Sequence, residues 1–193
     1  MDDFILYFKM GLTHVLDFSA YDHILFLIVL AVIFTNFQWR KVIWLVTLFT
    51  LGHSITLALS AYKILEVRMD LIEFLIPLTI FTTGLINIIN AKKEANKRGN
   101  INLILALFFG LIHGLGFSNY FKMMIGKEED KLFPLIEFAL GIEVAQIIIV
   151  LSILIIGYLL KSFFKIQRRD WILVSSSIVI GFSIQMMLDR VFW

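Results

Sequence analysis

Seven ionisable side chains of this sequence have the chemistry of metal ligands, and they lie in or beside strongly apolar stretches. They are His14, Asp22, His23, His53, Glu73, His113 and Glu143. An ionisable group in the hydrocarbon of a bilayer costs about 2.5–3.5 kcal/mol even on a lenient insertion scale, so such groups are rare unless they have a function. Lysine and arginine are absent from the long apolar stretches that carry all of these groups except His14. Imidazoles and carboxylates without neighbouring cations predict a site that binds a positive ion, either a metal or a proton.

The composition predicts that these side chains belong to an integral membrane protein. The chain has 193 residues, of which 60% are hydrophobic, and its mean hydropathy is +0.90. A soluble domain has about 45–50% apolar residues. The formal net charge of only +2 gives no basic surface for nucleic acid. Cysteine is absent, which excludes disulfides, thiolate ligands and a cysteine nucleophile. A bound metal must then use nitrogen and oxygen ligands, which suit Ni, Co, Zn, Fe or Mn better than Cu(I).

Hydrophobic runs predict the helices that must position these groups. We expect six spanning helices, at residues 21–36, 42–62, 69–90, 101–121, 132–160 and 171–188. The segment 4–16 is too short to span a core of about 30 Å. We expect it to form an interfacial or re-entrant half-helix, with a surface-lying amphipathic anchor as the alternative. No linker divides the chain, so the sequence predicts an all-α protein with a single polytopic transmembrane domain over residues 1–193.

Positive charges alternate between the predicted loops and therefore predict the orientation. Three loops carry most of them, namely Arg40 and Lys41, then Lys92, Lys93, Lys97 and Arg98, then Lys161, Lys165, Arg168 and Arg169. With six spans these loops lie on one side, which is cytoplasmic, and both termini are extracytoplasmic. The polar groups of the spans then fall in the outer half of the membrane. Their convergence from distant parts of the chain on one depth favours a shared site.

Each candidate also has a structural interpretation. His53 would serve equally as a hydrogen-bonding residue between helices. Gly110, Gly114 and Gly116 flank His113, and they predict either close helix packing or the approach of the backbone to a ligand. Glu143 could be a protonated, hydrogen-bonded carboxyl, because burial disfavours the charged form.

The remaining acids raise questions of geometry. Glu73 lies near enough to the interface for a solvated position at the rim. Asp22 and His23 are adjacent, so on a regular helix they diverge by about 100°. Either one of them is a ligand and the other supports it, or the helix begins between them.

Several motifs in this order resemble the HupE/UreJ family of bacterial membrane proteins. They read "GLTHVL", "YDHILFLIVL", "TLFTLGHSITLALS", "IEFLIPLTI", "FGLIHGLGF" and "FALGIEVAQ", and they extend over about residues 11–146. The resemblance implies a small polytopic protein of the bacterial inner membrane that acts as a nickel or cobalt permease. It places His14, Asp22, His23, His53, His113 and Glu143 at the family's polar positions. One departure concerns His14, because the family separates its first histidine from the Asp-His pair by a shorter, glycine-containing segment.

Two functions compete at this stage. The first is a permease that captures a divalent Ni, Co or Zn ion with the outer histidines and carboxylates. The second is a zinc-type intramembrane hydrolase or transferase for a lipid-like or lipid-anchored substrate, because catalytic zinc uses three protein ligands and one open position. In that enzyme Glu143 is the candidate general base, and Asp22 or Ser54 would orient the water. A metal-sensing or assembly partner is the third alternative, and the oligomeric state stays open.

Overall fold

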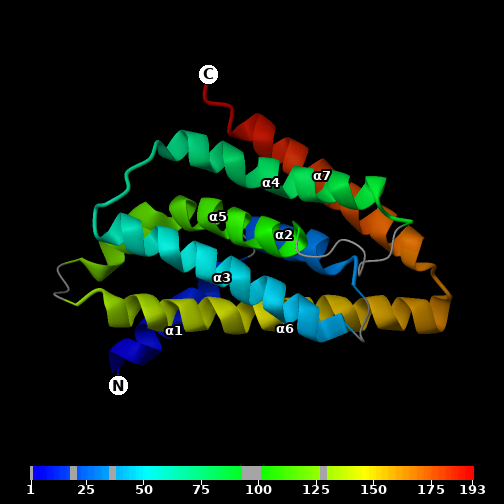
Figure 1. The fold of residues 1–193 in the computed structure, drawn as a ribbon, viewed down its shortest axis with the longest axis horizontal. Coiled ribbons are helices and arrows are strands. Elements are labelled where there is room, and N and C mark those ends of the chain that lie inside the picture. The colour runs from blue at the N-terminus through cyan, green and yellow to red at the C-terminus, as the bar shows by residue number, and fades with distance from the viewer. Residues whose placement is uncertain (1, 18–20, 35–37, 93–100, 127–129) are drawn as a thin grey trace.

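The computed structural model describes residues 2–17, 21–34, 38–92, 101–126 and 130–193. These residues form helices and contain no strand. In chain order the helices are α1 (Asp2–Leu16), α2 (Asp22–Ala31), α3 (Trp39–Ala61), α4 (Met69–Ile89), α5 (Ile101–Ile125), α6 (Leu132–Phe164) and α7 (Arg168–Asp189). Figure 1 shows α6 running from one end of the molecule to the other, with α3, α4 and α7 extending over much of the same length. The predicted all-helical architecture is confirmed.

Five helices, α3 to α7, are long and apolar enough to cross a membrane. Six spanning helices are not confirmed, because the region predicted as the first span forms the ten-residue helix α2. At 1.5 Å per residue, ten residues extend about 15 Å, or about half of the hydrocarbon core. Helix α1 has 15 residues and is also too short by this measure. The half-helix expected at 4–16 falls within α1, and its interfacial or re-entrant position stays a prediction.

The two short helices pack against different partners. Helix α1 lies against α6, whereas α2 lies among α4, α6 and α7. Along the chain, α1 approaches the middle of the bundle in Figure 1, and α2 leads on toward the end where α3 begins. The end of α1 and the start of α2 therefore lie among the long helices. Histidine side chains lie at both of these positions.

Glycines bring the helices that carry histidines unusually close to their neighbours. A Cβ atom added at Gly110 of α5 would lie 2.2 Å from the carbonyl oxygen of Phe49 in α3, and one at Gly114 would lie 2.3 Å from that of His53. At Gly11 of α1, it would lie 2.1 Å from the carbonyl oxygen of Phe138 in α6. Backbones approach this closely only where a side chain is absent. Gly110 and Gly114 therefore allow close packing of α3 and α5. Of the two interpretations of the glycines around His113, this is the structural one.

Candidate metal centre

Three histidines from three helices meet at the junction of α1 and α2. His14 lies in the last turn of α1, His23 in the first turn of α2 and His53 in the middle of α3. Each offers one ring nitrogen, and these three nitrogens lie within 4.8 Å of one another. The ring centroids of His14 and His23 are 4.5 Å apart. An ion bound tetrahedrally at 2.0–2.1 Å holds its nitrogens about 3.3 Å apart, so modest rotation of the rings would complete the geometry.

Most ring nitrogens of this cluster are buried without hydrogen-bond partners among the described residues. The Nε2 atoms of His14 and His23 and both ring nitrogens of His53 have none among the described residues. His53 is fully buried and His23 is 5% exposed. A buried polar atom without a partner is costly and rare in folded proteins. Several such nitrogens facing one another are the donor set of a cation site.

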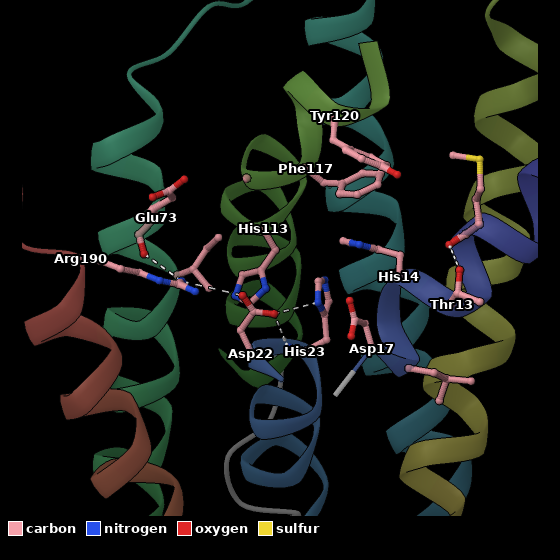
Figure 2. Close-up of a pocket in the computed structure, with 14 residues that line it drawn as sticks. Thr13, His14, Asp17, Asp22, His23, Glu73, His113, Phe117, Tyr120 and Arg190 are labelled. Carbon is pink, nitrogen blue, oxygen red and sulfur yellow. Dashed lines mark hydrogen bonds and ion pairs between the residues drawn. The ribbon is translucent and has the colours of Figure 1, made fainter. Parts of the chain in front are cut away.

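Asp22 supports His23 in this arrangement. Helix α2 begins at Asp22, whose Oδ1 accepts a hydrogen bond from the backbone N–H of His23 at 2.9 Å. The same oxygen lies 3.1 Å from His23 Nδ1, a close ionic contact without hydrogen-bond geometry, since Nδ1 has no hydrogen-bond partner among the described residues. A carboxylate beside one ring nitrogen of a histidine orients the ring and leaves the other nitrogen to bind a metal. Of the alternatives for the adjacent pair, the geometry favours His23 as ligand and Asp22 as its support (Figure 2).

His113 extends the cluster and has an assignable tautomer. The hydroxyl of Thr79 donates its one hydrogen to the carbonyl oxygen of Ile76 at 2.7 Å, and it lies 3.3 Å from His113 Nε2. That hydroxyl can then only accept from the imidazole, so Nε2 of neutral His113 carries the hydrogen. The lone pair is left on Nδ1, which is buried without a hydrogen-bond partner. The centroid of the His113 ring lies 5.6 Å from that of His23. His113 therefore adjoins the three-histidine group without being part of it.

A cavity of about 960 Å³ reaches three of the four histidines, whereas His53 lies behind its lining. His14, His23 and His113 line it, together with the apolar side chains of Met10, Ile76 and Phe117. Its carboxylates come from Asp17, Asp22 and Glu73, of which Asp17 and Glu73 are exposed. The position of Glu73 agrees with the rim position considered for it, and Figure 2 shows it on the far side of His113 from His14.

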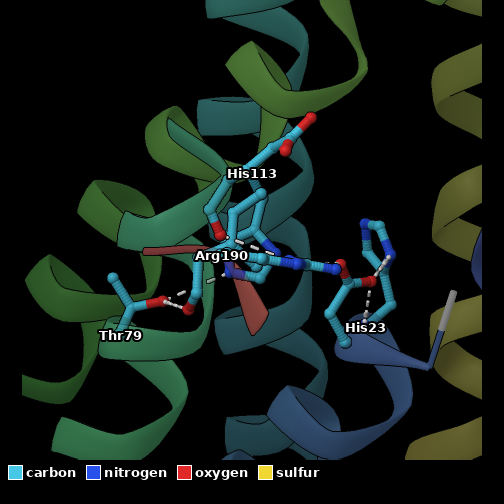
Figure 3. Close-up of polar contacts among 7 residues, drawn as sticks. His23, Thr79, His113 and Arg190 are labelled. Atoms are coloured by element: carbon cyan, nitrogen blue, oxygen red, sulfur yellow. Dashed lines mark hydrogen bonds and ion pairs between the residues drawn. The ribbon is translucent and has the colours of Figure 1, made fainter. Parts of the chain in front are cut away.

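Arg190 also lines this cavity, and it corrects the expectation of a pocket without cations. Its Nη1 donates a hydrogen bond to the carbonyl oxygen of Glu73 at 3.2 Å and lies 3.9 Å from Asp22 Oδ2. That carbonyl is free because Pro77, four residues further along α4, has no N–H to donate within the helix. Figure 3 shows Arg190 beside the Thr79–His113 pair and His23. Sequence reasoning missed Arg190 because it follows the last helix, far along the chain from both partners.

Glu143 lies apart from the three-histidine group. Its two carboxyl oxygens are hydrogen-bonded to the hydroxyls of Thr47 and Thr50 of α3. It is not among the residues that line the cavity, and neither is Ser54. Of the predicted site residues, the structure therefore brings together His14, His23 and His53, with Asp22 and His113 adjoining, Glu73 at the rim and Glu143 elsewhere.

Comparison with known proteins adds one match. A family model described as "HupE / UreJ protein" matches residues 1–190, nearly the whole chain. No curated protein matches the chain, and no solved structure does so either.

Proposed function

The chain belongs to the HupE/UreJ family, and on that premise we propose that it is a membrane permease for a divalent transition-metal ion such as Ni, Co or Zn. The single observation that carries this proposal is the three-histidine group of His14, His23 and His53, whose ring nitrogens lie within 4.8 Å of one another. Imidazole suits these metals, whereas Mg and Ca prefer oxygen ligands.

The charges of the cavity support a divalent cargo. Asp17, Asp22 and Glu73 contribute three negative charges and Arg190 one positive charge. With neutral imidazoles, the lining carries a formal charge of −2, which a divalent cation neutralises. A divalent cation in the cavity would leave no net formal charge on the lining, although water screens the charges of Asp17 and Glu73, which are exposed.

The short helices support transport rather than static storage. We infer that α1 and α2 are two halves of one crossing, interrupted where His14 and His23 lie. Secondary transporters often place their ion sites at such interruptions, where helix ends and freed backbone groups face the ion. The break would let α1 and α2 move separately as the ion passes.

The orientation remains the one that positive charges predict. Helix α3 begins and α4 and α6 end at the same end of the molecule in Figure 1, and the basic residues Arg40, Lys41, Lys161 and Lys165 lie there. We propose that this end is cytoplasmic in the bacterial inner membrane, so that the cavity opens outward.

Metal binding and uptake test the proposal. We expect purified protein to bind Co²⁺ in calorimetry, and proteoliposomes to accumulate radioactive Ni²⁺ or Co²⁺. His53→Ala should abolish both binding and uptake. Glu137→Gln is the control, because Glu137 lies in α6 outside the cavity lining, and it should leave both unchanged. Uptake that persists at the wild-type rate in His53→Ala would refute the assignment of the site.

The volume of the cavity favours a second candidate, the zinc-type hydrolase or transferase. About 960 Å³ far exceeds the roughly 30 Å³ that one water occupies in the liquid, and three imidazoles with an open position are a catalytic zinc arrangement. Asp22 is then the nearest candidate base, since Glu143 bonds to Thr47 and Thr50 instead. One zinc retained per chain through purification, with no metal uptake by proteoliposomes, would favour the enzyme over the permease.

A further inference from the structure

A second buried polar group lies between α3 and α6, and the histidine site does not use it. It consists of Thr47, Thr50, Glu143 and Gln146, which we call the Glu143 group. Gln146 is fully buried, and Thr50 is 8% exposed. Glu143 follows the start of α6 by eleven residues, or about 17 Å along the helix axis, which is about half of the hydrocarbon thickness.

Counting hydrogens in this group gives two consistent arrangements. The hydroxyl of Thr50 contacts Glu143 Oε2 and lies 3.1 Å from Gln146 Oε1, but it has one hydrogen to donate. If Glu143 is protonated, it donates to Thr50, and Thr50 donates to Gln146 Oε1. If Glu143 is ionised, Thr50 donates to the carboxylate, and the Gln146 amide turns so that its Nε2 donates to Thr50. The hydroxyl of Thr47 donates to Glu143 Oε1 in both arrangements.

The two arrangements differ by one proton and by the orientation of one amide. In the orientation present here Gln146 Nε2 is buried without a hydrogen-bond partner, and turning the amide would bring it within reach of Thr50. The carboxyl therefore has hydrogen-bond partners in both charge states, although it lies at membrane depth. We propose that Glu143 is a proton-binding site, separate from the metal site, that takes up and releases one proton during the transport cycle.

The position of the group gives the proton a role. Thr50 and Thr47 precede His53 by three and six residues on α3, about 4.5 Å and 9 Å toward the end where α3 begins. The Glu143 group thus lies one to two turns beyond the histidines, on the side away from the cavity. An ion leaving His53 inward would pass the carboxyl, and its positive charge would displace the proton. The coupling role rests on the proposed permease function, whereas the proton site itself does not.

Other ionisable groups on the packing partners of α6 do not replace Glu143 in this role. They are Tyr7, Lys9, His14, Asp17, Tyr21, Asp22, His23, Arg40, Lys41, His53, Tyr62 and Lys63 on or next to α1, α2 and α3. Among the described residues, the hydrogen bonds of the Glu143 carboxyl go to Thr47 and Thr50, and no ion pair joins it to any of these groups.

Infrared difference spectroscopy of the purified protein, between alkaline and acidic buffer, tests the proton site without any metal. We expect a carbonyl-stretch band of a protonated carboxyl that is lost in Glu143→Gln and retained in Glu137→Gln. The amide of Glu143→Gln has the shape of the carboxyl and can bond to both threonines, so this variant should fold. Thr50→Val should shift the band, and Thr50→Ser should restore it. A band that is unchanged in Glu143→Gln would overturn the proposal.

Transport separates this proposal from the permease function. In proteoliposomes, wild-type Co²⁺ uptake should respond to an imposed proton gradient, and Glu143→Gln should lose that response while it binds Co²⁺ with unchanged affinity. If wild-type vesicles take up no metal but the infrared band is lost in Glu143→Gln, the permease proposal fails and the proton site stands. If Glu143→Gln retains the full response to the gradient, the coupling role is refuted.

Discussion

At the scale of single residues, the histidine site depends on groups that touch histidines rather than the ion. Asp22 contacts His23, and Thr79 contacts His113. Such partners fix the ring orientation and decide which nitrogen carries the lone pair. They therefore distinguish a built metal site from histidines that only pack between helices.

Asp22→Asn should weaken metal binding because the amide keeps the shape of the carboxylate but not its charge. Loss of a supporting carboxylate typically lowers metal affinity about 10- to 100-fold. Calorimetry with Co²⁺ would measure the change. Asp70→Asn is the matched control, since Asp70 pairs with Arg68 at the exposed start of α4 and should leave affinity unchanged. Wild-type affinity in Asp22→Asn would show that the carboxylate does not support the site.

Arg190→Gln should act in the opposite direction and strengthen the binding of a divalent cation. The guanidinium lies 3.9 Å from Asp22 Oδ2, and its removal leaves the cavity lining more negative. A unit charge near a protein surface acts on a neighbour with about 1–4 kcal/mol before screening by salt, so we expect an increase of about tenfold at low salt. The same titration, repeated at high salt, should show a smaller increase. A decrease in affinity would mean that Arg190 chiefly positions Asp22.

At the scale of helices, glycine contacts determine where His53 and His113 lie. Helices α3 and α5 approach through Gly110 and Gly114, so both imidazoles come to the same level of the bundle. A methyl group at either glycine would separate the two helices.

Gly110→Ala should destabilise the protein, because its Cβ would lie 2.2 Å from the carbonyl oxygen of Phe49. Overpacking of this kind costs about 1–3 kcal/mol. Gly181→Ala is the matched control, since a Cβ there meets nothing within 4 Å, and it should raise stability by up to about 1 kcal/mol through helix propensity. Thermal unfolding in detergent would compare the two variants. Equal midpoints would contradict the close contact.

The helices also show how far the sequence alone could lead. Long apolar runs predict α3 to α7 because hydrophobicity over about 20 residues is a strong local signal. The family resemblance is confirmed over residues 1–190. The residue types indicate all four histidines as candidate ligands but do not single out the three whose ring nitrogens lie closest. The short length of α2 and the position of Arg190 are not local properties. The first depends on packing among α4, α6 and α7, and the second on a carbonyl that Pro77 frees on another helix.

At the scale of the whole molecule, the absence of cysteine makes the proposed orientation easy to test. Glu66→Cys, between α3 and α4, should react with a membrane-impermeant maleimide added to intact spheroplasts. Lys165→Cys, between α6 and α7, should react only after permeabilisation. The unsubstituted chain provides a background without thiols. Labelling of Lys165→Cys in intact spheroplasts would reverse the orientation and place the cavity on the cytoplasmic side.

The division of the three histidines among α1, α2 and α3 has a thermodynamic consequence. Helix α1 rests mainly on α6 and makes little contact with α2, so a bound ion would add a noncovalent link between them beside the connecting chain. A ligand that binds the folded form alone adds about 2.7 kcal/mol of stability at a hundred times its dissociation constant. A bound ion would thus stabilise the arrangement of these helices reversibly. The unfolding temperature of the protein should therefore rise with the occupancy of the metal site.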